Sequence, residues 1–168
     1  MGMGLRRGLA CGVVLGSLAV AATPAFAQAL STHRIPAALA LEAVGAAVEA
    51  CKSQGYNETA VVVDASGARQ AVLRGDNAGV HSLDSAFGKA YTSASFKAPS
   101  GAIAERLLAN PSSAQLGLLP HVLLLGGGLP IKIGDEVVGA IGAGGAPGAD
   151  KDEACAKAGI DKIADRLK

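Results

Sequence analysis

Two short turns between β-rich runs constrain the fold of this chain more than any other feature. The first turn, Asp-Ala-Ser-Gly at 64–67, separates the run Thr59–Val63 from the run Ala68–Leu73. The second turn is Gly134-Asp135, a dipeptide typical of two-residue hairpins. Turns this short join strands that run in opposite directions, because a parallel pair needs a crossover of about a dozen residues or more. The sequence therefore predicts an antiparallel sheet.

Three further β-rich runs lie around the second turn. Leu129–Ile133 and Glu136–Ile141 flank it directly, and Val122–Leu125 comes shortly before them. Gly and Pro residues stand close to the ends of these runs, as they do for strands in general. Together with the two runs of the first hairpin, they predict a sheet of five strands.

Apolar residues at helical spacing predict helices around these strands. The first helix is expected from Pro36 to about Ser53, with Gly55 just past its end. A second helix, capped by Ser82, ends before Pro99, and a third is expected at about 101–109.

A fourth helix follows a Gly-rich loop near the C-terminus. Asp150 and Glu153 fit an acidic capping box at its start, and its apolar stripe is Ile160, Ile163 and Leu167. The predicted order is α-β-β-α-α-β-β-β-α. We therefore expect an α+β fold in which a five-stranded antiparallel sheet is flanked by helices and the two terminal helices share one face.

The first 27 residues match an export signal. Arg6 and Arg7 form a charged start, an apolar run covers 9–22, and Ala-Phe-Ala at 25–27 is a small-x-small cleavage pattern. We expect cleavage after this signal, a single domain over 28–168, and a periplasmic or secreted location. The arginine pair leaves the twin-arginine route open beside the general export route.

Composition excludes several classes of function. Lys and Arg number 15 and Asp and Glu number 14, without a basic cluster, which argues against binding to nucleic acid and to anionic lipid. Beyond the export signal, no apolar run reaches the roughly 18 residues that a membrane helix needs. Hydrophobic residues make up 50% of the chain, too many for a disordered protein.

Cys51 and Cys155 are the cysteines that remain after the export signal. The first is expected on the first helix and the second on the last helix. In an oxidising compartment they either form a disulfide or fill the core as small buried residues, and the sequence leaves both alternatives open.

Common catalytic motifs are missing from the chain. It has no Gly-x-Ser-x-Gly, no His-Glu-x-x-His and no Cys-x-x-Cys-His. The Gly-rich stretch 139–145 precedes a helix that begins with Asp150 and Asp152, and their negative charge disfavours phosphate there. We interpret these glycines as positions of close backbone packing.

One face of the second helix mixes a cation, hydroxyls and an aromatic ring. It consists of Ser85, Lys89, Thr92 and Phe96, opposite the stripe expected to face the sheet. This outward face is either solvated or a surface for a ligand or a second subunit.

Short motifs follow one another from about Ser31 onward. They are Val61-Val62-Val63-Asp64 with Gly67, Arg74-Gly75-Asp76, Ser85-Ala86 with Lys89-Ala90-Tyr91-Thr92, Gly127-Gly128-Leu129-Pro130-Ile131, and Gly139-Ala140-Ile141-Gly142 with Gly145 and Asp150. In this order they resemble the GlcG/HbpS family, also called the haem-degrading-domain family, which is related to the C-terminal domain of PduO proteins. The resemblance implies a profilin- or PAS-like antiparallel sheet, non-covalent haem binding, and assembly into dimers or octamers. It also implies haem or iron handling in oxidative stress, with a sensor protein as partner.

The resemblance also implies an iron-side residue. Thr92 occupies the place of the threonine that contacts haem iron in the exported members, whereas the histidine-ligated PduO mode needs a histidine on the first helix, which has none. His81 lies about three helical turns from Thr92 and could flank the same pocket. Lys89 and Arg74 are candidates to bind the propionates, and Phe96 to stack on the porphyrin. By chemistry alone, the further donors are His33, His121, Tyr56, Tyr91 and the two cysteines.

Three hypotheses about function follow. The first is an exported haem-binding protein. The second is an enzyme that degrades haem or converts a small organic acid, although the sequence identifies no positioned acid or base for it. The third is an oligomeric interaction partner of a sensor protein, without physiological haem.

Overall fold

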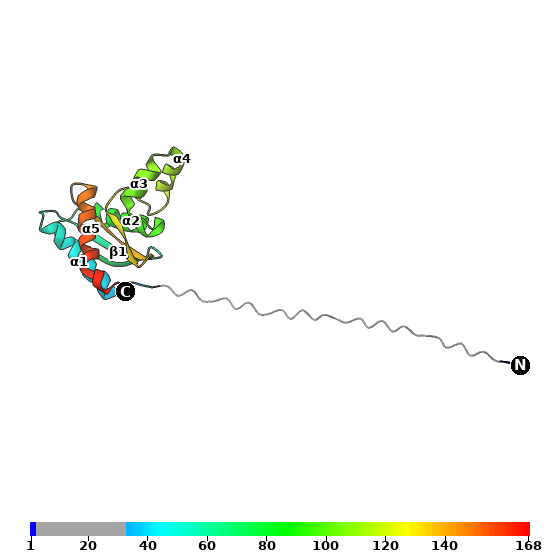
Figure 1. Ribbon diagram of the computed structural model, residues 1–168. Coiled ribbons are helices and arrows are strands. Elements are labelled where there is room, and N and C mark those ends of the chain that lie inside the picture. The colour runs from blue at the N-terminus through cyan, green and yellow to red at the C-terminus, as the bar shows by residue number, and fades with distance from the viewer. Residues whose placement is uncertain (3–32) are drawn as a thin grey trace. The chain divides into compact units, whose positions relative to one another are not determined.

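The computed structural model describes residues 1–2 and 33–168 (Figure 1). The cleavage pattern and the apolar run of the predicted export signal lie outside the described residues. Among the described residues, no helix is both long enough and apolar enough to cross a membrane.

The sheet has four strands, and every pair of neighbours is antiparallel. The strands are β1 (Thr59–Asp64), β2 (Arg69–Arg74), β3 (Gly128–Ile133) and β4 (Glu136–Gly144), in the order β2-β1-β4-β3. Both predicted hairpins are confirmed, and Gly67 and Gly134 adopt the positive φ that their turns require. In the first turn, the Asp64 carboxylate accepts hydrogen bonds from the backbone N–H groups of Ser66 and Ala68.

The predicted fifth strand, Val122–Leu125, is wrong, because this segment is an extended loop outside the sheet. Side-chain hydroxyls bind its backbone instead of a neighbouring strand. Thr92 accepts from the N–H of Leu123 at 2.8 Å, and Ser100 donates to the carbonyl of Leu125 at 2.7 Å. A short apolar segment can find partners for its backbone N–H and C=O groups either in a sheet or among side-chain hydroxyls. The apolar pattern alone therefore did not distinguish a strand from a loop.

The described part of the chain has five α-helices. They are α1 (Ala37–Lys52), α2 (His81–Phe96), α3 (Ser100–Leu108), α4 (Pro111–Ala114) and α5 (Ala149–Ile163), with 3₁₀ turns η1 (Gln115–Leu118) and η2 (Ala164–Arg166). Figure 1 shows α1 and α5 side by side, and they pack on the same face of the sheet as predicted. Helix α2 covers the opposite face.

Alternate residues of β1 face the two helical layers. Ala60 and Val62 pack among residues of α1 and α5, whereas Val61 and Val63 pack against α2. This alternation follows from the two-residue period of a strand, and burial on both faces explains why the strand is apolar throughout.

Glycines of β3 and β4 let α2 approach the sheet backbone directly. A Cβ atom at Gly142 would lie 2.1 Å from the carbonyl oxygen of Ala86, and one at Gly128 would lie 2.2 Å from that of Lys89. The interpretation of the 139–145 stretch as close backbone packing is therefore confirmed.

Two predicted helix caps are wrong. The N-cap residues of α2 and α5 are Val80 and Gly148, and neither helix has a side-chain cap. The Ser82 hydroxyl donates to the carbonyl of Gly79 and bonds the Thr59 hydroxyl at 2.6 Å, which ties α2 to β1. At the start of α5, the carboxylate that binds a backbone N–H is that of Asp152, which accepts from Ala146 at 3.0 Å.

Candidate functional site

Two of the four residues on the face of α2 that we expected to point outward are buried, and the other two are half-buried. Lys89 and Thr92 are 1% and 0% exposed, whereas Ser85 and Phe96 are half-buried. The loop at 121–125 covers this part of α2, so the helix packs on two sides rather than one. The spacing of residues along a helix shows which of them share a face, but it does not show whether a loop covers that face.

Thr92 uses its hydroxyl within the chain. Its Oγ1 accepts from the N–H of Leu123 at 2.8 Å and donates to the carbonyl oxygen of the same residue at 3.3 Å. The hydroxyl therefore fastens α2 to the loop that contains His121.

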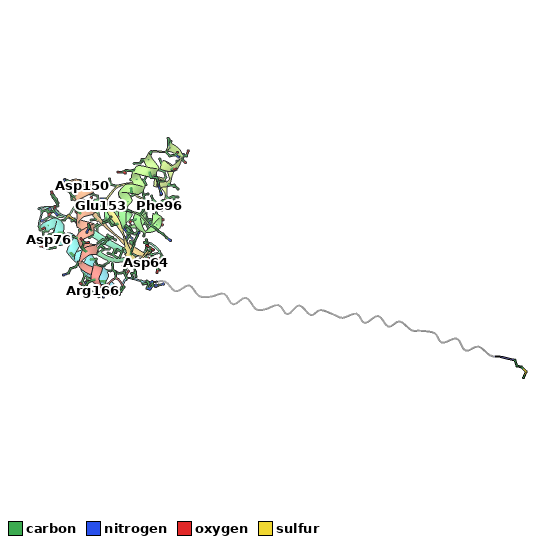
Figure 2. All side chains as sticks on the ribbon, viewed as in Figure 1. Asp64, Asp76, Phe96, Asp150, Glu153 and Arg166 are labelled. Atoms are coloured by element: carbon green, nitrogen blue, oxygen red, sulfur yellow. A yellow bond between two sulfur atoms is a disulfide. The ribbon has the colours of Figure 1, made fainter. Side chains whose placement is uncertain are left out.

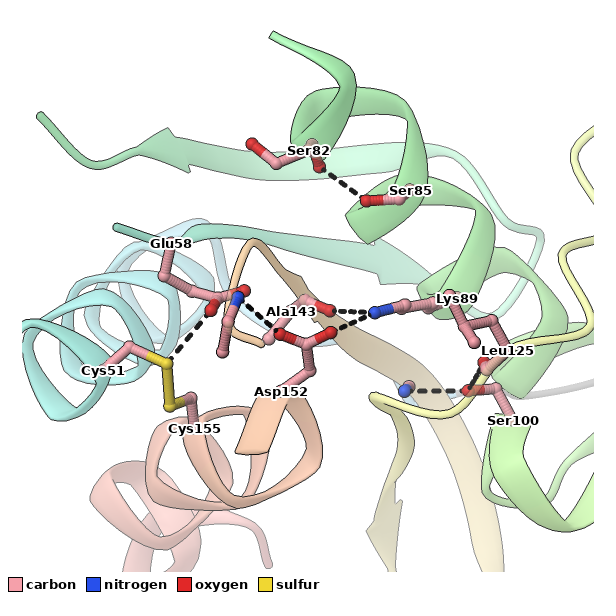
Figure 3. A network of polar contacts seen from close by, with 12 residues as sticks. Cys51, Glu58, Ser82, Ser85, Lys89, Ser100, Leu125, Ala143, Asp152 and Cys155 are labelled. Carbon is pink, nitrogen blue, oxygen red and sulfur yellow. Dashed lines mark hydrogen bonds and ion pairs between the residues drawn. A yellow bond between two sulfur atoms is a disulfide. The ribbon is translucent and has the colours of Figure 1, made fainter. Parts of the chain in front are cut away.

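Lys89 lies in a buried ion pair instead of at the surface. Its ammonium group contacts the Asp152 carboxylate and donates to the carbonyl of Ala143 at 3.0 Å (Figure 3). Asp152 therefore neutralises the charge that we assigned to a propionate.

Glu58 joins this network, and the sequence analysis missed it. Its side chain is 1% exposed, and its Oε2 lies 3.0 Å from the Sγ of Cys51 (Figure 3). Burial and the nearby Asp152 carboxylate raise the pKa of Glu58 to about 8. A glutamate directly before an uninterrupted apolar strand was the signal that could have found it.

The two cysteines form a disulfide, which settles the alternatives that the sequence left open. Cys51 on α1 and Cys155 on α5 are fully buried, and their Cα atoms are 5.5 Å apart. The bridge connects the two helices that share one face of the sheet.

The structure does not gather the five predicted site residues around one cavity. Arg74 donates to the carbonyl of Ala78. His81 is exposed at the start of α2, and Phe96 lies on the last turn of that helix (Figure 2). Arg74 lines one of the three best-formed cavities among the described residues, of about 410 Å³, and the other four residues line none of these three.

Three aromatic side chains meet where the loop at 121–125 packs on α2, and we call Phe87, Tyr91 and His121 the aromatic cluster; Phe87 is buried, Tyr91 half-buried and His121 exposed. The ring of His121 lies 5.1 Å from that of Phe87 and 5.5 Å from that of Tyr91, centroid to centroid. The guanidinium of Arg69, from β2, lies 3.4 Å from the centroid of the Phe87 ring. The imidazole of His121 is exposed. The cluster and the neighbouring Arg69 thus bring together a nitrogen donor, two rings and a cation. These are the groups that a porphyrin with its iron and propionates would contact.

The largest cavity has different chemistry. It has a volume of about 880 Å³ and lies between α3, β3 and α5, with Leu124, Leu129 and Ile160 among its apolar walls. Its charged lining residues are Glu105, Asp150, Glu153, Lys157 and Asp161, and Asp150 and Glu153 are marked in Figure 2. Lys157 pairs with Asp161 at 2.6 Å. No imidazole or sulfur donor among the described residues lines this cavity, and its carboxylates would repel propionates.

Residues 35–161 match the family described as haem-degrading protein HbpS-like. The match covers the whole sheet and nearly all of the helices around it. The chain belongs to the HbpS-like family. The resemblance predicted from the motifs is therefore confirmed, although no curated protein sequence matches the chain.

Solved structures of several proteins share this fold. A double mutant of HbpS from Streptomyces reticuli is 38% identical with a TM-score of 0.75, and the match covers 84% of this chain and 97% of that one. The ORFY protein of Klebsiella pneumoniae is 24% identical with a TM-score of 0.78, covering 84% and 98%. A haem complex of the PduO C-terminal domain is 23% identical with a TM-score of 0.65, covering 73% and 89%. The last two similarities show the fold alone.

Proposed function

We propose that this protein is an exported haem-binding protein that holds haem non-covalently at the aromatic cluster. Membership of the HbpS-like family supports a role in haem handling. The observation that favours this particular site is the exposed imidazole of His121 beside two aromatic rings.

In this proposal, each group of the aromatic cluster has a separate task. The imidazole of His121 is the axial donor to iron and the half-buried ring of Tyr91 contacts the porphyrin, while the buried ring of Phe87 supports both from below. Arg69 pairs with a propionate. Thr92 acts through its hydrogen bonds to Leu123, which hold the loop that presents His121.

A second arrangement keeps Thr92 as the iron-side residue, with His81, Lys89, Arg74 and Phe96 around it. This arrangement requires the loop at 121–125 to move away, because the loop now uses the Thr92 hydroxyl. It also requires Lys89 to leave Asp152. The two arrangements predict different effects of substituting His121.

A haemin titration of residues 28–168, followed at the Soret band, tests the proposal. We expect saturable one-to-one binding, and a loss of affinity of at least about tenfold in His121→Ala. The matched control is His33→Ala, which removes another exposed imidazole, and it should bind like the wild type. Non-saturating absorbance in the wild type would refute haem binding. Wild-type affinity in His121→Ala together with lost affinity in Thr92→Val would favour the second arrangement.

The remaining walls of the haem site are proposed to come from a second copy of the chain. Leu116, Leu118 and Leu119 are exposed on and just after η1, close in sequence to His121. Exposed apolar side chains in one patch are typical of subunit contacts. Light scattering of the purified protein should give the mass of a dimer or an octamer, and Leu118→Glu should lower it. A monomeric wild type would contradict this part of the proposal.

We further propose that export removes residues 1–27 and that the protein handles haem or iron during oxidative stress, in contact with a sensor protein. The intact mass of the exported protein tests the cleavage site. A deletion strain with unchanged tolerance of haemin and peroxide would contradict the role in stress.

A further inference from the structure

Glu58 is a buried carboxyl group with one oxygen bonded at Cys51, and the haem proposal has no use for it. Its Oε1 has no hydrogen-bond partner among the described residues. Leaving such an atom unpaired destabilises the folded state, because the oxygen gives up its hydrogen bonds to water and gains none in the protein. A buried apolar residue would avoid this penalty, so the carboxyl group calls for a specific explanation.

The surroundings of Glu58 contain two sulfur atoms. One atom each from Glu58, Cys51 and Cys155 lies within 4.8 Å of the other two, and all three residues are buried. In the disulfide the sulfurs are bonded to each other and are poor ligands. As thiolates they would be strong ligands for a soft metal ion.

We propose that Glu58, Cys51 and Cys155 form a Zn²⁺ site when their disulfide is reduced. Two thiolates and one carboxylate give three ligands of types that Zn²⁺ takes in proteins, and the fourth position stays open to water. The Cα atoms of the cysteines, 5.5 Å apart, already hold both sulfurs at one place, so the sulfurs need only separate to bind one ion at about 2.3 Å each.

A small dithiol can reduce the disulfide between Cys51 and Cys155. A dithiol supplies two electrons and two protons, the S–S bond of the protein breaks, and the dithiol becomes a cyclic disulfide. Both cysteines are then thiols. Binding of Zn²⁺ releases their protons and any proton on Glu58 to solvent, because the metal takes the deprotonated ligands.

The fold also offers an approach to the site. Glu58 forms part of the wall of the cavity of about 410 Å³, which Val48 and Tyr56 also line. On the other side, Lys89 pairs with Asp152, so this carboxylate is already neutralised and does not compete for the ion. The inference does not depend on haem binding, since no residue of the aromatic cluster takes part.

Cobalt binding to the reduced protein tests the site. Residues 28–168 are reduced with a phosphine, which becomes the phosphine oxide with oxygen from water, and Co²⁺ is then added without air. We expect one equivalent of Co²⁺ to produce sulfur-to-cobalt charge-transfer absorption that Zn²⁺ removes, and no such absorption in the oxidised protein. Glu58→Gln should weaken binding at least about tenfold. The matched control is Glu49→Gln, an exposed glutamate in the wall of the same cavity, and it should bind like the wild type.

Two results would overturn the proposal. One is the absence of charge-transfer absorption in reduced protein that keeps its circular dichroism spectrum. The other is equal affinity in Glu58→Gln and the wild type. If reduction unfolds the metal-free chain, thermal unfolding of protein reduced in the presence of Zn²⁺ decides, and a midpoint that Zn²⁺ does not raise also rejects the site.

Discussion

A buried carboxyl group keeps its proton to a higher pH than an exposed one, and the environment of Glu58 shows two reasons for this. The side chain is removed from water, and the Asp152 carboxylate lies nearby. A third argument comes from the disulfide. Its sulfurs have no hydrogen, so a hydrogen bond between Glu58 and Cys51 requires the proton on the carboxyl group.

This proton makes stability depend on pH. The pKa of Glu58 is about 8 in the folded protein and near 4.5 in the unfolded chain, so the folded state binds more protons between these values. We expect the contribution of Glu58 to the free energy of unfolding to be complete below about pH 4.5 and to fall as the pH rises towards about 8, by on the order of 3 kcal/mol between pH 5 and 8. Urea unfolding of oxidised wild type and Glu58→Gln across this range measures the difference. A difference that stays constant with pH would contradict the raised pKa.

Thr92 is a second single residue with a clear structural role, because its hydroxyl binds a backbone segment that a neighbouring strand would otherwise bind. Its two hydrogen bonds satisfy the backbone of Leu123. Thr92→Val keeps the shape but leaves this buried N–H group without an acceptor, so we expect a loss of about 1–3 kcal/mol in the free energy of unfolding. Thr92→Ser keeps the hydroxyl and should lose much less. Chemical denaturation of both variants checks this, and a loss in Thr92→Ser as large as or larger than that in Thr92→Val would contradict the role of the hydroxyl.

At the scale of elements, the contact between α2 and β4 depends on the absence of side chains. Gly142 has no room for a Cβ atom, because the carbonyl oxygen of Ala86 would lie 2.1 Å from it. Backbone atoms on both sides cannot move away without separating the helix from the sheet. The sequence showed these glycines, but only the packed layers show which backbone each one faces.

Gly142→Ala should therefore be severely destabilising, with a loss of at least about 3 kcal/mol in the free energy of unfolding. Gly45→Ala is the control, because a Cβ atom there meets nothing within 4 Å. Gly45 lies inside α1, where alanine favours the helix by about 1 kcal/mol over glycine. Thermal unfolding should show opposite shifts, and a harmless Gly142→Ala would mean that α2 is free to shift on the sheet.

At the scale of the whole molecule, the disulfide connects segments that are 104 residues apart. Closing so long a loop restricts the unfolded chain strongly, which stabilises the folded state by about 4.7 kcal/mol in the chain-entropy model. We expect the double variant Cys51→Ala, Cys155→Ala to lose about 3–5 kcal/mol when both proteins are unfolded in denaturant without reductant. Adding reductant should bring the wild type to a similarly lowered stability, and no change on reduction would contradict the role of the bridge.

The sequence by itself determined the two hairpins, the four longer helices and the sheet-facing stripe of α2, because turn chemistry and periodicity act between residues close in the chain. It also determined the family, through motifs in a constant order. Only the tertiary structure decided the partners of Lys89, Thr92 and Val122–Leu125, since each depends on a residue distant in sequence. The same is true of the aromatic cluster, whose His121 comes from a loop that no local pattern places beside Phe87. Glu58 beside the disulfide is a further case, since burial of a charged residue is a property of the assembled layers and not of its neighbours in the chain.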